Sequence, residues 1–148
     1  RYLANVQACI TCCYILIDAE MCKLEFINAG CPSILLYRSE SRQIVELEST
    51  FDSLSLSSIN NDVVCHGEEM SWQPHDILIL SPNAINAITE RKSLNGKPYG
   101  INRLRKTIIA SADLSPLEIQ RRVLSDLNTH TMGASSDSDV IIVVIKAN

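Results

Sequence analysis

The stretch LEFINAGCPSILLYR, residues 24–38, places a turn between two apolar segments. Apolar and polar side chains alternate over Leu24–Ala29, as they do in a strand with one buried face. Gly30 and Pro32 then break the pattern and indicate a change of chain direction. The stretch therefore predicts a strand, a turn and a second strand, which makes an antiparallel sheet the first expectation for the fold.

Segments on both sides of this stretch complete two antiparallel pairs. We expect Ala8–Ile17 to pair with Lys23–Ala29 through a turn at Asp18–Glu20. Ser33–Tyr37 is expected to pair with Gln43–Glu48. A period of two residues thus dominates the first part of the chain.

A serine-rich segment, Ser49–Asp62, interrupts the strands and predicts an exposed loop. Strand patterns return at Val63–Trp72 and at Ile77–Leu80, with a turn at Pro74–Asp76 between them.

Helical patterns follow at Ala84–Arg91 and at Ile101–Ala110. A third helix, Ser115–His130, has the most specific start in the chain. Its first residue is an N-cap serine, Pro116 occupies the first helical position, and Glu118 is the acid of a capping box.

A β-branched run, Val140–Ile145, follows the acidic, serine-rich loop Ala134–Asp139. It predicts a strand that is buried on both faces at the centre of the sheet. The order of the elements predicts an α+β fold, an antiparallel β-sandwich flanked by helices.

Composition and charge limit the possible functions. The chain has 148 residues, of which 46% are hydrophobic, so one domain spanning residues 1–148 is expected. A formal net charge of −4 leaves no broad cationic face, which argues against a nucleic-acid partner. The apolar runs are shorter than the roughly 20 residues of a membrane helix, so we expect no membrane span.

The six cysteines lie mostly inside apolar, strand-like runs rather than at the spacings of a secreted disulfide scaffold, so we expect a reducing, cytoplasmic location. Cys9, Cys12 and Cys13 are spaced like half of a zinc site, but no second close pair follows them. We interpret these cysteines as small buried hydrophobes.

The remaining titratable side chains are interpreted as surface residues. Arg103, Arg105 and Lys106 are expected on the solvated face of an amphipathic helix. The histidines are far apart in sequence and are expected at the surface: His66, His75 and His130.

Three stretches occur in a recognisable order: LEFINAGCPSILLYR at 24–38, WQPHDILILSPNA at 72–84 and SDVIIVVIK at 138–146. This order resembles the bacterial protein phosphatase 2C-like domains of the SpoIIE and RsbU type. The first stretch is similar to the family's strand–NAGH-P–strand signature, with Cys31 at the histidine position. The second is similar to its apolar strand that ends in Asp-Gly, and the third to its acidic pair and last strand.

The resemblance implies hydrolysis of phosphoserine by two Mn²⁺ or Mg²⁺ ions, in bacterial sigma-factor partner switching. Aspartates at the ends of central strands would hold these hard cations. In this chain the Asp-Gly pair falls on Asn83 and Ala84, and the acidic pair falls on Ser138 and Asp139. The likeness covers the C-terminal two-thirds of the family's domain, and the family's upstream Asp-Gly strand has no counterpart here.

Asp137 or Asp139 would replace the carboxylate missing at Ser138 if the loop shifted by one residue. In a regular strand, however, such a shift aims the side chain at the opposite face. Asp137 and Asp139 are the remaining metal candidates, and neither a catalytic residue nor a metal cofactor is expected. In the simplest interpretation, Ser81 or Asn83 caps the start of a helix.

Two functions follow from the resemblance. In the first, the chain is a degenerate phosphatase-like domain that binds a regulatory protein, such as a phosphorylatable anti-anti-sigma-type protein, or a second copy of itself. Its contact residues would be Asn83, Ala84, Asp137 and Asp139. In the alternative, it is the C-terminal part of an active Mn²⁺- or Mg²⁺-dependent protein-serine phosphatase whose other ligands lie upstream.

Overall fold

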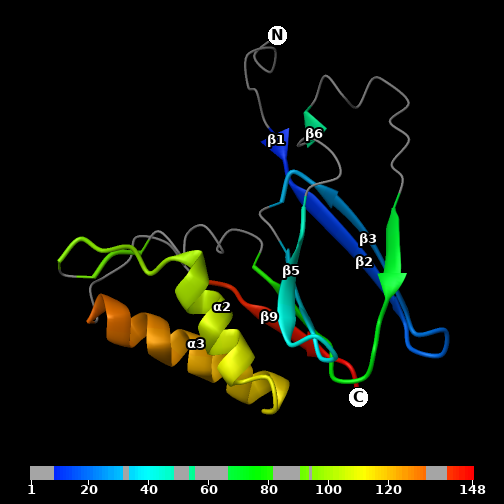
Figure 1. Cartoon of the computed structure of the whole chain (residues 1–148). Helices are drawn as coiled ribbons and strands as arrows, with labels where there is room; N and C mark the ends of the chain where they lie inside the picture. Colours follow the sequence, from blue (N-terminus) through cyan, green and yellow to red (C-terminus); the bar gives the residue numbers. More distant parts are fainter. Residues whose placement is uncertain are drawn as a thin grey trace, which may run out of the picture. The chain divides into compact units, whose positions relative to one another are not determined.

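The computed structural model describes residues 9–31, 34–48, 54–55, 67–81, 91–93, 95–132 and 140–148 (Figure 1). The chain divides into two compact units, each made from two stretches of sequence. Unit 1 is Arg1–Cys31 with Glu48–Trp72, and unit 2 is Pro32–Leu47 with Gln73–Asn148.

Unit 1 contains antiparallel strands. β1 (Cys9–Ile10) pairs with β6 (Leu54–Ser55). A separate sheet has the order β2-β3-β7, formed by β2 (Cys12–Asp18), β3 (Lys23–Ala29) and β7 (Glu68–Ser71). The predicted hairpin is therefore confirmed, because β2 and β3 pair over their whole lengths.

Three boundaries in unit 1 differ from the prediction. Of the strand expected over Val63–Trp72, β7 covers Glu68–Ser71, Gly67 is not in a strand, and residues 63–66 lie outside the described residues. The strand expected over Ala8–Ile17 is divided at Thr11 into β1 and β2. The segment Ser49–Asp62 was expected to be a loop, but Leu54–Ser55 forms β6, and the rest of it lies outside the described residues. A serine-rich sequence does not exclude a strand when a partner supplies backbone hydrogen bonds.

The sheet of unit 2 has the order β5-β4-β8-β9, and all neighbours are antiparallel. Its strands are β4 (Ile34–Arg38), β5 (Gln43–Leu47), β8 (Ile77–Leu80) and β9 (Val143–Lys146). The strand predictions at Ser33–Tyr37, Gln43–Glu48 and Ile77–Leu80 are thereby confirmed to within one residue.

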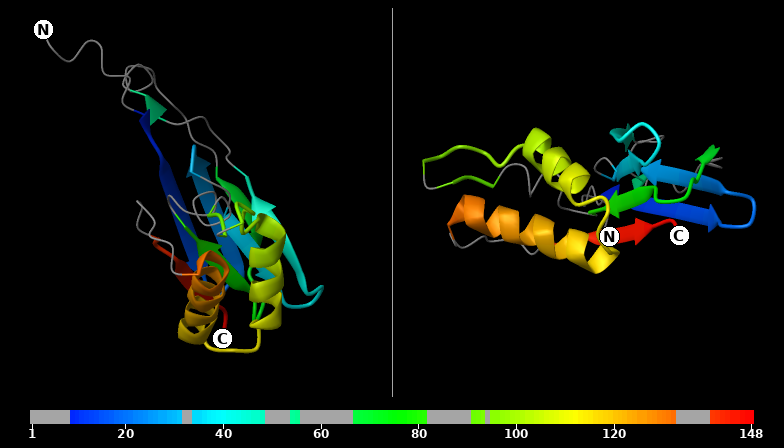
Figure 2. Two further views of the ribbon diagram at one scale, coloured as in Figure 1. Left: turned by 90° about the vertical axis from the view of Figure 1, so that its left-hand side faces the viewer. Right: turned by 60° about the horizontal axis from the view of Figure 1, so that its bottom comes forward.

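Two helices, α2 (Ile101–Ala110) and α3 (Pro116–Thr131), lie side by side (Figure 2). The capping box is present as predicted. The Ser115 hydroxyl accepts a hydrogen bond from the Glu118 N–H, and the Glu118 carboxylate accepts one from the Ser115 N–H. The helix predicted at Ala84–Arg91 lies outside the described residues.

The helices cover one face of the unit 2 sheet. Alternate residues of β4 and β8 point to this face and form one apolar core with the inner residues of α2 and α3. Its fully buried members are Leu35, Ile77, Leu104, Ile108, Ile119, Val123 and Leu127. The predicted α+β class, with antiparallel sheets and flanking helices, is confirmed. None of the described helices is long and apolar enough to span a membrane.

The position of β9 corrects a prediction. Its run was expected at the sheet centre with both faces buried, but among the described strands β9 lies at one end of the order. Ile142 belongs to the core, whereas Ile141 is 56% exposed and Val143 is 42% exposed. Side chains alternate across a strand, so a continuous β-branched run can cover a core with only every second residue.

Candidate functional site

The predicted metal corner comprises Asn83, Ala84, Asp137, Ser138 and Asp139, and all five positions lie outside the described residues. The structure therefore describes the strands that flank this corner rather than the corner itself.

These flanking strands are neighbours. Leu80, near the end of β8, is the register partner of Val143 at the start of β9. The Ser81 hydroxyl, which is buried, donates a hydrogen bond of 2.6 Å to the Ile141 carbonyl. Two stretches that are 60 residues apart in sequence are thus fixed together at one end of the sheet, next to both predicted motifs.

The NAGC turn is held by its asparagine. Asn28 is fully buried, and its side-chain oxygen accepts a hydrogen bond of 3.0 Å from the Cys31 N–H. Its amide group donates back to the Cys31 carbonyl at 3.4 Å. Gly30 has a φ of 70°, which a residue without Cβ adopts at low cost. Asn28 therefore has a structural role in this turn.

The nearby cysteine thiols are free, but the prediction that they are buried is wrong: Cys12 is exposed, and Cys13 and Cys31 are only partly buried. Burial, followed by the neighbouring Cys31 and Cys12, raises the pKa of Cys13 to about 11. A thiol with a raised pKa stays protonated and is a poor nucleophile. Among the described residues, no group of three or more His, Cys, Asp or Glu side chains is placed to hold a metal ion.

A polar cluster, which we call the helix clasp, joins α2 to α3. Its centre is Asp126 on α3, which accepts hydrogen bonds from Arg103 Nη2 at 2.7 Å and Nε at 3.0 Å. Tyr99 and Thr107 also donate to Asp126, at 2.6 Å and 3.0 Å. Mainly because of Arg103, the pKa of Asp126 lies well below its usual range.

The clasp continues through Tyr99 and His130. Burial, then the hydrogen bond to Asp126, raises the pKa of Tyr99 to about 12, so its hydroxyl remains a donor at neutral pH. Arg103 donates to His130 Nδ1, and His130 Nε2 donates to the Lys97 carbonyl, each at 3.0 Å. These contacts use the neutral tautomer with its proton on Nε2.

The clasp corrects the prediction for the basic residues of α2. Arg103 pairs with Asp126, and Arg105 forms an ion pair with Glu46 of β5. Only Lys106 of this group is an exposed, solvated charge, while His130 is partly buried instead of lying free at the surface. His66 lies outside the described residues. The partners of Arg103 and Arg105 are far away in sequence, so a helical pattern could not indicate them.

A buried acid, Asp76, was missed by the sequence prediction. Asp76, only 1% exposed, accepts hydrogen bonds from the backbone N–H groups of Ser39 and Gln73 at 2.8 Å and 3.0 Å. It also forms an ion pair of 3.0 Å with Arg38. The proline turn before Asp76 was the available signal, since turns often end on an aspartate that binds nearby backbone. Asp76 thus fixes two turns of unit 2.

Comparison with known proteins identifies the family. A family model described as stage II sporulation protein E (SpoIIE) matches residues 2–148. The chain belongs to the SpoIIE family. The predicted resemblance to SpoIIE- and RsbU-type phosphatase domains is therefore confirmed, although no curated protein gave a significant match.

Solved structures share the fold at low sequence identity. The SiaA-PP2C domain of Pseudomonas aeruginosa matches with a TM-score of 0.74 and 15% identity, over 93% of this chain and 52% of that chain. The SpoIIE phosphatase domain of Bacillus subtilis, presoaked with Mn, matches with a TM-score of 0.65 and 15% identity, over 100% of this chain and 60% of that chain.

A Mycobacterium tuberculosis protein with RsbU and RsbW domains matches with a TM-score of 0.64 and 16% identity, over 93% of this chain and 36% of that chain. The SpoIIE-family chain thus has the fold of a PP2C phosphatase domain. It spans 52% of the SiaA domain and 60% of the SpoIIE domain.

The metal centre implied by the resemblance can be tested against the donors in this sequence. Asn83 and Ser138 are neutral, which leaves Asp137 and Asp139 as the carboxylates of the two motifs. Hard divalent cations are held mainly by charged oxygen ligands. The donors of these motifs therefore do not fit a site for two such cations.

Proposed function

We propose that this SpoIIE-family chain is a phosphatase-like regulatory domain that acts through protein binding rather than turnover. The observation that carries the proposal is the pair of neutral residues, Asn83 and Ser138, at positions where the resemblance implies metal-binding aspartates. Two cations that share an attacking hydroxide need carboxylates to offset their charge. An amide and a hydroxyl supply no such charge.

A binding function is compatible with what the fold retains. The apolar core, the helix clasp and the capped helix α3 form a rigid support. Binding requires a surface of stable shape, and loops on a rigid scaffold are where recognition residues concentrate. The proposed contact residues are those of the predicted metal corner: Asn83, Ala84, Asp137 and Asp139.

The proposed partner is a regulatory protein of bacterial signalling, of the phosphorylatable anti-anti-sigma type. A second copy of the chain is the other partner that the proposal admits. Both would meet the acidic side chains Asp137 and Asp139, so a partner surface with complementary basic groups is expected.

A phosphatase assay tests the absence of turnover. We expect the protein, incubated with Mn²⁺ and a phosphoserine protein, to release no phosphate above the metal-free background. The variant Asp139→Ala should behave in the same way. Metal-dependent release that Asp139→Ala abolishes would overturn the proposal, because it would show that the acidic loop still serves a metal site.

Restoring carboxylates at the predicted metal corner tests the same proposal through Mn²⁺ binding. Calorimetric titration with Mn²⁺ should detect no tight site in the unchanged protein. The triple variant Asn83→Asp, Ala84→Gly, Ser138→Asp should gain measurable affinity, because it returns two carboxylates to the corner. Micromolar Mn²⁺ binding by the unchanged protein would count against a degenerate site.

One observation favours the alternative, an active phosphatase with further ligands upstream. The chain spans little more than half of the SiaA-PP2C domain and 60% of the SpoIIE domain that it resembles. In that case the full-length protein would bind Mn²⁺ and release phosphate even though residues 1–148 alone do neither.

A further inference from the structure

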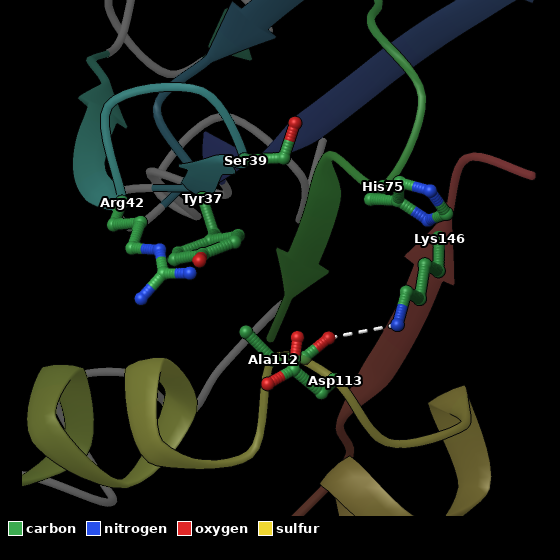
Figure 3. Close-up of a pocket in the computed structure, with 7 residues that line it drawn as sticks. All are labelled: Tyr37, Ser39, Arg42, His75, Ala112, Asp113 and Lys146. Carbon is green, nitrogen blue, oxygen red and sulfur yellow. Dashed lines mark hydrogen bonds between the residues drawn. The ribbon is translucent and has the colours of Figure 1, made fainter.

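A pocket of about 300 Å³ lies in unit 2, among the turns that follow β4, precede β8 and join α2 to α3 (Figure 3). These turns are at the end of the sheet opposite to Leu80 and Val143, which flank the predicted metal corner. The side chains that matter for its chemistry are Tyr37, Ser39, Arg42, His75, Asp113 and Lys146. None of them was part of the predicted site.

Two hydrogen-bond systems hold the pocket walls in place. Asp76 binds the Ser39 N–H, and the Ser39 hydroxyl donates to the Pro74 carbonyl at 2.7 Å. The His75 N–H donates to the Ala147 carbonyl at 3.1 Å, which ties the second turn to the residue after β9. The positions of these turns are therefore fixed by the buried Asp76 and by backbone contacts.

Lys146 holds the third wall. Its ammonium group donates to the carbonyls of Ala112 and Leu114, at 2.7 Å and 2.9 Å. These bonds use two of the three N–H donors of a lysine and leave one donor for a ligand. Both acceptors are neutral carbonyl groups, so these two hydrogen bonds do not neutralise the positive charge of Lys146.

The pocket brings three basic side chains to one concave space. In Figure 3, Arg42 lies beside Tyr37 on one wall, His75 and Lys146 line the opposite wall, and Ala112–Asp113 forms the base. Arg42 makes no hydrogen bond or ion pair with any other described residue, so its guanidinium is available. Arginine, lysine and histidine on the walls of one cavity, against a single acid, Asp113, favour an anionic ligand.

His75 occupies a turn with a left-handed backbone. Its φ is 66°, and Arg42, in the turn after β4, has a φ of 55°. The His75 side chain lines the pocket and adds a basic nitrogen to it.

We propose that this pocket binds a small phosphate monoester. The phosphate oxygens would accept hydrogen bonds from Arg42 and Lys146, with the imidazole of His75 beside them. Asp113, the one acid among the lining side chains, would accept a hydrogen bond from a hydroxyl group of the ester. A volume of about 300 Å³ is at the lower end for ligand pockets, so the organic part is no larger than a short polyol.

Calorimetric titration with glycerol 3-phosphate and with inorganic phosphate tests the proposal on the full protein. We expect glycerol 3-phosphate to bind with a sub-millimolar Kd and inorganic phosphate to bind more weakly. The exposed Arg42→Gln substitution should weaken binding of the ester about tenfold, because it removes a charge-assisted hydrogen bond. Arg121→Gln, which removes an exposed arginine of α3 outside the pocket, should leave binding unchanged.

The Asp113→Asn substitution distinguishes the contribution of the phosphate group to binding from that of the organic part of the ester. Loss of the negative charge removes repulsion of the phosphate group of both probes, whereas only the ester loses a hydrogen-bond acceptor for its carbon-bound hydroxyl groups. Asp113→Asn should therefore weaken binding of glycerol 3-phosphate relative to binding of inorganic phosphate. No binding of either probe at millimolar concentration would overturn the proposal. Equal losses in Arg42→Gln and Arg121→Gln would also overturn it, because they would indicate non-specific attraction to surface charge.

Discussion

At the scale of single residues, one buried acid, Asp76, holds two turns of unit 2. Asp76 combines near-complete burial with two backbone donors and one arginine. Such a carboxylate stabilises the fold because its charge is matched by donors that would otherwise lack partners. It binds the backbone of Ser39, which lines the proposed ester pocket.

Replacement of this acid is the first prediction for stability. Asp76→Asn should lower the free energy of unfolding by about 2–4 kcal/mol, since the amide group would face a backbone N–H donor and Arg38 would lose its counter-charge. Urea denaturation followed by circular dichroism measures the loss.

The exposed Asp113→Asn provides the matched control, with an expected change within about 0.5 kcal/mol. If both variants unfolded at the same urea concentration as the unchanged protein, the assigned role of Asp76 would be wrong.

At the scale of elements, the helix clasp fixes α3 against α2. Its bonds connect Asp126 to Arg103, Tyr99 and Thr107, so one carboxylate joins a helix, the preceding loop and a second helix. The apolar contacts of the core hold the helices on the sheet, while the clasp specifies their mutual register. The packing of α2 against α3 therefore depends on pH through the ionisation of Asp126.

The clasp predicts a loss of stability in acid. The pKa of Asp126 is lower in the folded protein than in the unfolded chain, so its contribution is present above the ordinary aspartate pKa of about 3.9 and is lost as the pH falls below it. Asp126→Asn should cost about 1–3 kcal/mol at pH 7, because hydrogen bonds to a charged group are replaced by neutral ones.

Urea unfolding at pH 7, 5 and 3 checks the sign of this effect. The difference between the unchanged protein and Asp126→Asn should narrow as the pH falls to 3, because Asp126 of the unfolded chain then binds a proton while the folded carboxylate still resists protonation. The exposed Asp113 is a suitable control position, and Asp113→Asn should show no comparable narrowing. A constant difference at all three pH values would contradict the proposed role of the charge.

At the scale of the whole molecule, the chain passes repeatedly between its two units. The crossings lie at residues 31–32, 47–48 and 72–73. Neither unit is a continuous segment, so the sheets of each unit can form fully only when both of its stretches have folded. A single domain over residues 1–148 predicts that the two units unfold together.

Two spectroscopic probes can test this cooperativity. Trp72, the chain's one tryptophan, is buried in unit 1, while α2 and α3 lie in unit 2. We expect tryptophan fluorescence and circular dichroism at the helical band to give coincident thermal transitions. Two separate midpoints would show that the units are independent domains.

The proposed binding function leads to the last prediction. Charge reversal at Asp137 and Asp139 to lysine should weaken capture of an anti-anti-sigma-type protein, or self-association, by at least tenfold without changing the melting temperature. Lys106→Glu, on the exposed side of α2, is the matched control and should have no effect. Sedimentation and pull-down measurements distinguish the two partners. If Lys106→Glu abolished capture while the double charge reversal did not, the partner would bind to α2 and not to the predicted metal corner.

The sequence by itself determined the local elements of this protein. The capping box of α3, the bounds of α2 and the hairpin of β2 with β3 all follow from residues that lie close together in the chain. Helix caps and side-chain periodicity act over a few positions, so their signals can be read without knowledge of the fold. The family motifs were found for the same reason, since each is a short continuous stretch.

The tertiary structure alone decided the contacts between distant residues. Arg103 and Asp126 are 23 residues apart, and Ser39 and Asp76 are 37 residues apart, so neither pairing has a signature in the local sequence. The place of β9 in the sheet and the walls of the ester pocket likewise depend on which strands and turns become neighbours. A charged side chain looks the same in sequence whether it is solvated or paired, because burial is a property of the packed chain rather than of the residue.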